Sequence, residues 1–213
     1  RVLDSGRLSY GPFLKAFEAG FAKLHNRRFA VSANSGTSAL QVALHALKEL
    51  DGWKDGDEVL VPAMTFIATS NVVIQNGLRP VFVDIDPRTY HIDPNDAEKR
   101  ITRRTRAIMP VHLFGVSCDM KAIKALAKRH KLRIVEDACQ TAAVSHEGKP
   151  VGSQGDIACF STYIAHIITT GVGGMSLTNA SLLALKMRSL VNHGRDNIYI
   201  SSDDDRGLKG KKL

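Results

Sequence analysis

The chain has 213 residues, of which 44% are hydrophobic, and its formal net charge is +8. This length and composition are typical of one globular domain and exclude disordered and fibrous proteins. No apolar run approaches the roughly 18 residues that span a bilayer, and residues 1–4 do not begin a signal peptide, so we expect no membrane and a cytoplasmic location. The basic residues are spread over helix-like segments, which favours solvated faces or an anionic small ligand over nucleic acid.

Three cysteines, Cys118, Cys139 and Cys159, are widely spaced and form no C-x-x-C pair. Zinc sites and iron–sulfur clusters need clustered thiolates, so we expect neither a metal site nor a cluster. Reduced thiols are the expected state.

The first predicted element is an amphipathic helix over residues 13–24, preceded by Gly11-Pro12. Phe13, Phe17 and Phe21 recur in it at spacings of four, which places them on one helical face. We expect all three to be core residues.

A short strand from about Ala30 leads into the turn Ser35-Gly36-Thr37, which opens a helix that reaches about Leu50. Such a turn presents free backbone N–H groups and hydroxyls at the positive end of the helix dipole, which suits a phosphate group. Ser and Thr are also common as plain helix caps, so that alternative stays open.

The next strand is expected over residues 58–62 and is followed by Thr65-Phe66, where another helix opens. Ligands of α/β folds bind at the carboxyl ends of strands, so Phe66 is a candidate for stacking on a ring. Periodicity alone favours a core position for Phe66.

Strands and helices then alternate, which predicts βαβ units and a mostly parallel sheet between helices. The last residues, 193–213, have the composition of a loop. Further strands are expected at 80–85, 106–112, 132–137, 157–162 and 173–178, and helices at 93–100, 119–130 and 181–191.

Two titratable residues stand out at the ends of predicted strands. Asp137 ends one strand, where its carboxylate either caps the next turn or pairs with a protonated ring nitrogen. His166 lies between an apolar strand and a glycine-rich segment, where it is either a packed imidazole or a proton-transfer group.

The motifs S-G-T-S-A-L, G-D-E-V-L-V-P-A-M-T-F-I-A-T, P-V-F-V-D-I-D-P, V-E-D-A-C-Q, G-D-I-A-C-F-S and G-V-G-G occur in this order. In order and spacing the chain resembles the vitamin-B6-dependent sugar aminotransferases of the DegT/StrS family over residues 1–196. The resemblance implies the large domain of the aspartate-aminotransferase-type fold (fold type I), over 1–196. It leaves 197–213 as a loop or a truncated C-terminal segment, with the family's small C-terminal domain absent from this chain.

The resemblance also implies ligands and partners. Pyridoxal or pyridoxamine 5'-phosphate is the implied cofactor, a nucleotide-linked keto sugar the implied substrate, and glutamate is considered as amino donor. A homodimer is implied as well. The residues implied to bind the cofactor are Gly36, Thr37 and Ser161 for the phosphate, Phe66 for the ring face, Asp137 for the ring nitrogen and Gln140 for the 3-hydroxyl.

The chain departs from the family pattern at two positions. His166 stands where the family has the lysine that binds the cofactor covalently, so no such bond can form there. Val172 replaces the glutamate of the family's G-E-G-G turn. Lys149 and Lys186 lie outside the motif and are not substitutes for that lysine.

His in place of Lys is the exchange found in the related sugar 3-dehydratases, since an imidazole still takes and returns protons near neutral pH. We therefore predict a pyridoxamine-phosphate-dependent 3-dehydratase of deoxy-sugar or polysaccharide biosynthesis, acting on a 4-keto sugar with His166 as base. Two alternatives stay open: an aminotransferase homologue with impaired turnover, and a non-catalytic ligand-binding or regulatory protein on the same scaffold.

Overall fold

The structure, a computed structural model, describes residues 3, 4 and 10–195, so the segment 197–213 lies outside the described residues. The helices are α1 (Pro12–Leu24), α2 (Gly36–Asp51), α3 (Ala68–Gln75), α4 (Pro94–Lys99), α5 (Met120–His130) and α6 (Ser181–Val191). The strands are β1 (Phe29–Ala33), β2 (Glu58–Pro62), β3 (Arg79–Val83), β4 (Thr105–Ile108), β5 (Arg133–Asp137), β6 (Ser145–His146), β7 (Lys149–Pro150), β8 (Ile157–Ser161) and β9 (Gly174–Thr178).

A seven-stranded sheet runs through the molecule in the order β1-β9-β8-β5-β4-β2-β3. Strand β9 is antiparallel to both of its neighbours, and the other neighbouring pairs are parallel. This confirms the expected α/β fold with a mostly parallel sheet. Strands β6 and β7 form a separate two-stranded hairpin that the sequence did not predict.

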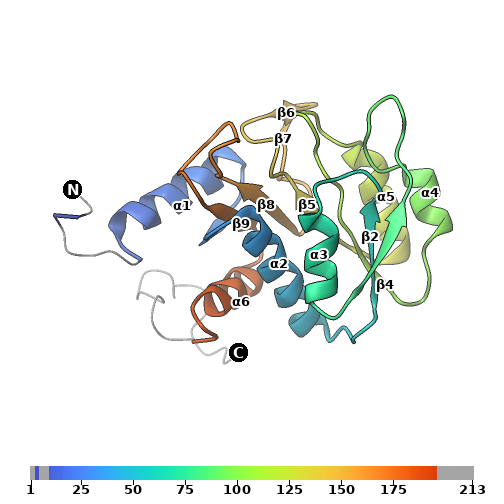
Figure 1. Ribbon diagram of the computed structural model, residues 1–213, viewed down its shortest axis with the longest axis horizontal. Helices are drawn as coiled ribbons and strands as arrows, with labels where there is room; N and C mark the ends of the chain where they lie inside the picture. Colours follow the sequence, from blue (N-terminus) through green and yellow to red (C-terminus); the bar gives the residue numbers. More distant parts are fainter. Residues whose placement is uncertain (1–2, 5–9, 196–213) are drawn as a thin grey trace.

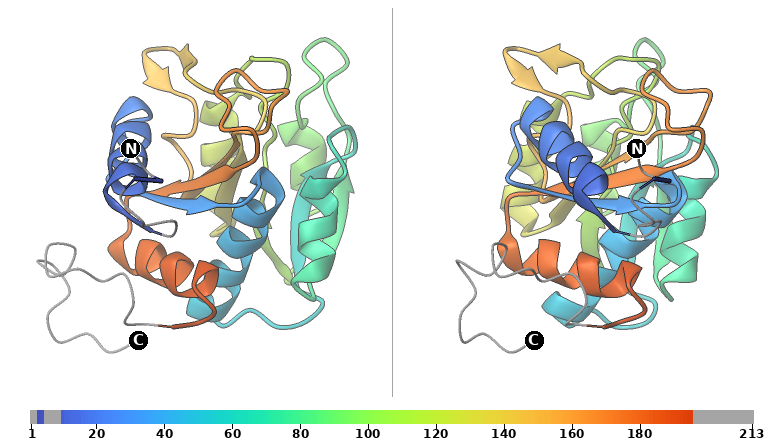
Figure 2. Two further views of the ribbon diagram at one scale, coloured as in Figure 1. Left: turned by 60° about the vertical axis from the view of Figure 1, so that its left-hand side comes forward. Right: turned by 90° about the vertical axis from the view of Figure 1, so that its left-hand side faces the viewer.

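Helices cover both faces of the sheet (Figures 1 and 2). Successive strand residues point to opposite faces, so Val59 and Val61 of β2 join the core under α2, α3 and α6. Leu60 between them joins the core formed with α4 and α5. Helix α1 packs on the other end of the sheet, where Phe21 contacts Phe160 of β8.

Two expectations about local structure are wrong. Strand β4 ends at Ile108 instead of residue 112, because Pro110, whose carbonyl accepts from the Asp137 N–H at 2.9 Å, has no N–H of its own to continue the ladder with β5. Phe13 is 49% exposed, whereas Phe17 is partly buried and Phe21 is buried. Phe13 lies in the first turn of α1, at the end of the helix that extends past the sheet (Figure 1), so it is not a core residue.

Helices long and apolar enough to cross a bilayer are absent from the described residues.

Candidate functional site

A pocket of about 480 Å³ lies where β2, β5 and β8 end and where α2 begins. Its wall contains all seven residues that the sequence singled out. These residues come from four separate stretches of the chain, so the fold is what brings them together. They are Gly36, Thr37, Phe66, Asp137, Gln140, Ser161 and His166.

The start of α2 forms one wall of the pocket. Ser35 caps the helix, because its Oγ accepts a hydrogen bond from the backbone N–H of Ser38 at 3.1 Å. The first N–H groups of a helix have no partner within it, so Gly36 and Thr37 bring unpaired donors and the positive end of the helix dipole to the pocket. Ser35 can therefore cap α2 while the free N–H groups of Gly36 and Thr37 bind an anion.

Gly36 is required here by close packing. A Cβ on Gly36 would lie 2.8 Å from Cys139 Sγ and 2.8 Å from Ser161 Cβ, both closer than side chains tolerate. The missing side chain lets α2 approach β8, and it keeps Ser161 beside the helix N-terminus. Ser161 is buried, and its Oγ accepts a hydrogen bond from the Tyr163 N–H at 3.3 Å.

Asp137 is the last residue of β5 and is only 4% exposed. Both carboxylate oxygens have donors: Thr69 Oγ1 donates to Oδ2 at 2.8 Å, and the Cys139 N–H donates to Oδ1 at 3.2 Å. Its backbone carbonyl accepts from the His112 N–H at 2.9 Å. The Asp137 carboxylate is thus held in place at the pocket wall by a donor on each oxygen.

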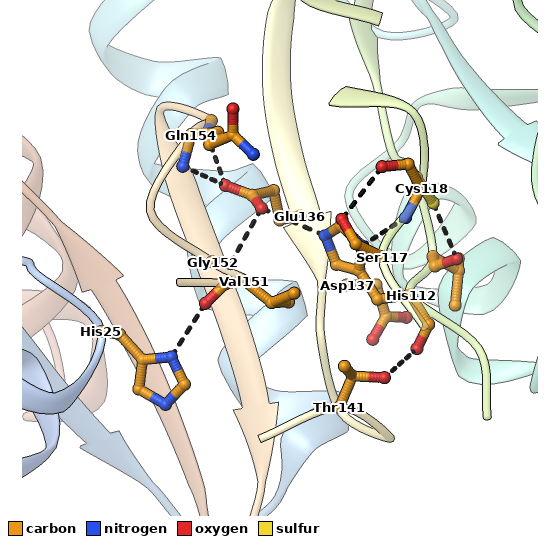
Figure 3. Close-up of polar contacts among 12 residues, drawn as sticks. His25, His112, Ser117, Cys118, Glu136, Asp137, Thr141, Val151, Gly152 and Gln154 are labelled. Carbon is orange, nitrogen blue, oxygen red and sulfur yellow. Dashed lines mark hydrogen bonds and ion pairs between the residues drawn. The ribbon is translucent and has the colours of Figure 1, made fainter. Parts of the chain in front are cut away.

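Glu136, one residue earlier, does not line the pocket and lies in a buried polar network (Figure 3). Burial raises the pKa of a carboxyl group, but the hydrogen bonds from His112 and the N–H of Gly155 and the charge of Arg27 outweigh burial and lower the pKa of Glu136. The donors at Glu136 are His112 Nε2, Arg27 and the N–H groups of Gly152, Gln154 and Gly155.

His112 connects this network to the strand that carries Asp137 (Figure 3). Its Nδ1 accepts a hydrogen bond from the Cys118 N–H at 3.0 Å, so Nε2 carries the proton that is donated to Glu136. Thr141 Oγ1 donates to the His112 carbonyl at 2.6 Å. These hydrogen bonds hold the end of β5, and therefore Asp137, in place from the side of the strand that faces away from the pocket.

His166 lies in the loop between β8 and β9, half-buried, with its backbone N–H bonded to the Tyr163 carbonyl at 2.9 Å. Its ring lies edge-on to Tyr163, with 6.5 Å between the ring centroids. Within the described residues the imidazole makes no hydrogen bond, and it lines the pocket. His166 is therefore not a packed core histidine.

Phe66 is 67% exposed, so the expectation that it lies in the core is wrong. It follows the end of β2, where the chain leaves the sheet, and its ring lines the pocket. Gln140 lies on the same wall and accepts a hydrogen bond from the Phe114 N–H at 3.4 Å. Val172 is exposed and is not part of the pocket wall.

Four residues near the site were missed by the sequence analysis. Thr65, Cys139 and Tyr163 line the pocket, and Thr69 bonds Asp137. In the sequence, Thr65 and Thr69 lie one helical turn apart on either side of Phe66, and this spacing could have identified them as site residues. Burial and the neighbouring Asp137 charge raise the pKa of the Cys139 thiol well above its usual value, so this thiol is not a nucleophile.

Lysine is absent from the described residues that line the pocket. Lys149 lies on the β6–β7 hairpin, and Lys186 of α6 forms an ion pair with Glu49. Neither side chain replaces an amine at position 166.

Comparisons with known proteins agree with this geometry. A model of the DegT/DnrJ/EryC1/StrS aminotransferase family matches residues 1–211. The chain is 47% identical over 188 residues to the GDP-perosamine synthase of Caulobacter vibrioides, covering 88% of this chain and 50% of that protein.

Two solved structures are similar as well. S. venezuelae DesV in complex with a ketimine intermediate has a TM-score of 0.88 and 44% identity, over 93% of this chain and 53% of that chain. The E. coli GDP-4-keto-6-deoxy-D-mannose-3-dehydratase with bound hydrated PLP has a TM-score of 0.81 and 32% identity, over 86% of this chain and 48% of that chain.

The chain thus spans about half the length of the curated relatives it matches. Its likeness to these structures confirms the expected fold, the large domain of the fold type I aminotransferases. Motifs, sheet order and comparisons lead to the same conclusion: the chain belongs to the DegT/DnrJ/EryC1/StrS aminotransferase family.

Proposed function

We propose that the protein is a vitamin-B6-dependent enzyme acting on a nucleotide-linked 4-keto sugar, as a pyridoxamine-phosphate-dependent 3-dehydratase with His166 as base. One observation carries this proposal: His166 shares a pocket with Asp137 and the start of α2, and none of the described residues lining that pocket is a lysine. The similarity to an E. coli 3-dehydratase and to a GDP-perosamine synthase supports the class of substrate.

The pocket fits pyridoxamine or pyridoxal phosphate in both size and donor set. A flat ring needs an apolar face, a pyridinium needs a carboxylate, and a phosphate needs clustered donors. When bound, pyridoxamine phosphate supplies an amine that condenses with a sugar ketone and a conjugated ring that accepts electrons. We assign Gly36, Thr37 and Ser161 to the phosphate, Phe66 to the ring face, Asp137 to the ring nitrogen and Gln140 to the 3-hydroxyl.

His166 supplies the proton transfer in this proposal. Imidazole is the side chain that ordinarily gains and loses a proton near neutral pH, and this one lines the pocket with no competing hydrogen bond from the described residues. In the proposed reaction an imidazole nitrogen would take up the proton that leaves the amine-bearing carbon of the cofactor. It would return that proton to the departing 3-hydroxyl, which leaves as water, and the amine would be released as ammonia. Glutamate is the amino donor that we propose for returning the cofactor to its amine form.

We also propose a homodimer. Large apolar side chains are exposed around the pocket mouth, on the loops that follow β2, β4 and β8. Exposed apolar side chains on loops that also line the pocket suit a subunit interface, and a second copy would cover the pocket. The side chains are Phe66, Ile67, Phe114, Val116, Tyr163, Ile164 and Ile167.

The test is a product assay. The protein is mixed with pyridoxamine phosphate and a 4-keto-6-deoxy nucleotide sugar, and release of a 3-deoxy sugar is measured. Formation of that product supports the dehydratase. Transfer of the amine to the sugar would instead favour the aminotransferase homologue. Binding of the cofactor without turnover would favour a non-catalytic ligand-binding protein. The absence of a lysine from the described pocket-lining residues and the exposed Val172 also favour that alternative.

A further inference from the structure

Thr69 is a buried polar residue to which the proposed chemistry assigns no role. It lies in the first turn of α3 and is 0% exposed. Its Oγ1 donates a hydrogen bond to Asp137 Oδ2 at 2.8 Å. The same hydroxyl is 2.8 Å from Thr65 Oγ1, and Thr65 lines the pocket.

This hydroxyl pair has a fixed direction. Asp137 Oδ2, when ionised, only accepts, so the Thr69 proton points to the carboxylate. Thr69 Oγ1 is then free to accept the proton of Thr65. The hydrogen bonds therefore form a chain from the pocket surface: the Thr65 hydroxyl donates to Thr69 Oγ1, and the Thr69 hydroxyl donates to Asp137 Oδ2.

The two carboxylate oxygens of Asp137 are held from different sides. Oδ1 accepts from the Cys139 N–H, within the turn that follows β5, and Oδ2 accepts from Thr69 of a different element. A backbone donor alone holds one oxygen and leaves the carboxylate able to tilt about the Cβ–Cγ bond. The second donor fixes the plane of the carboxylate.

We infer that Thr69 is a positioning residue, whose buried hydroxyl fixes the Asp137 carboxylate for pairing with the ring nitrogen of a B6 phosphate. The inference rests on the proposed function, because it requires a pyridine ring beside Asp137. Thr69 touches neither the cofactor nor the sugar in this role. Its effect passes entirely through Asp137.

The experiment separates this role from simple stabilisation by using two ligands. Pyridoxamine phosphate is compared with its 1-deaza analogue, in which a C–H group replaces the ring nitrogen, and both affinities are measured by calorimetry. Thr69→Val removes the donor with almost no change in shape, and Thr69→Ser restores it. Thr178→Val is the matched control, because Thr178 is also fully buried but donates to the Asp156 carbonyl at the far end of β9.

We expect Thr69→Val to weaken pyridoxamine phosphate binding by about 10- to 100-fold, the usual effect of one hydrogen bond to a charged group. Affinity for the 1-deaza analogue should stay within about twofold, since that ligand does not use the carboxylate charge. Thr69→Ser and Thr178→Val should both retain the wild-type preference for the ring nitrogen.

Three results would overturn the inference. Equal losses for both ligands in Thr69→Val would mean that Thr69 only stabilises the pocket. Equal affinity of the wild type for both ligands would mean that Asp137 does not pair with the ring nitrogen, although the protein would still bind the cofactor in this pocket. Failure of the wild type to bind either ligand would refute the proposed cofactor site itself, and the role of Thr69 with it.

Discussion

Glu136 and Asp137 are adjacent carboxylates with different roles, and the strand geometry separates them. Successive residues of β5 point to opposite faces of the sheet, so Asp137 reaches the pocket while Glu136 enters the buried network with His112 and Arg27. The ion pair with Arg27 is fully enclosed. Removing one partner of such a network leaves the other groups buried and unsatisfied.

Glu136→Gln should therefore destabilise the protein by about 3 kcal/mol at neutral pH, measured by urea unfolding. A glutamine has one acceptor oxygen, and its NH₂ group would face the donors that now bond Glu136. Glu147→Gln is the matched control, because Glu147 is exposed in the β6–β7 turn, and its stability should equal that of the wild type. Equal stability of both variants would contradict the network's role.

The same variant has a defined pH dependence. Because the folded state lowers the pKa of Glu136 below its ordinary value of 4.5, ionised Glu136 stabilises the fold above that value. This contribution is lost as the pH falls through the lowered pKa of the folded state. The stability difference between wild type and Glu136→Gln should shrink in that acid window and stay constant from pH 5 upward.

At the scale of elements, the site depends on how closely α2 approaches β8. Ser35 caps α2, and Gly36 removes the side chain that would separate the helix from Ser161 and Cys139. The helix N-terminus and the strand end thus form one continuous surface. A glycine at this position is needed for close approach, and its backbone conformation is ordinary.

Gly36→Ala should cost about 1 to 3 kcal/mol of stability and should weaken binding of the B6 phosphates, because the new Cβ pushes Ser161 away from the helix. Gly20→Ala in α1 is the control, since a Cβ there meets no atom within 4 Å. That variant should gain about 0.5 to 1 kcal/mol, as alanine favours helices. Urea unfolding and ligand titration measure both effects, and unchanged stability in Gly36→Ala would contradict the close-approach argument.

The sequence predicted most elements and the pocket because both follow from local patterns. Alternating hydrophobic runs indicated the central strands, and Ser35-Gly36-Thr37 and Asp137 lie at strand ends where ligands collect. Periodicity alone favoured a core position for Phe66, because hydrophobicity does not distinguish a residue of the core from one that lines a pocket. The family resemblance instead implied a role at the ring face. The bond from Thr69 to Asp137 joins residues 68 positions apart, so only the fold reveals it.

For the whole molecule, the apolar residues around the pocket mouth predict self-association. We expect a dimer at micromolar concentration in analytical ultracentrifugation, since a stable interface buries about 800 Å² per subunit. Ile167→Asp should shift the protein toward monomer. Ile167 is exposed on the loop after β8 of a single chain, and in the proposed dimer the new charge would be buried in the interface, which is costly.

Ile74→Asp is the matched control for this prediction. Ile74 is similarly exposed, but it lies at the end of α3 away from the pocket, so its charge should leave the dimer intact. A wild type that sediments only as monomer would count against the proposed dimer. Loss of the dimer in both variants would show that the interface is not centred on the pocket mouth.

Replacing the imidazole of His166 tests the proposed proton transfer. Release of 3-deoxy sugar is measured for wild type and His166→Asn with pyridoxamine phosphate and a 4-keto-6-deoxy nucleotide sugar, alongside cofactor affinity. We expect His166→Asn to reduce the rate by about 10²- to 10⁴-fold, the usual contribution of a positioned base, with the cofactor still bound. An unchanged rate of 3-deoxygenation in His166→Asn would contradict it.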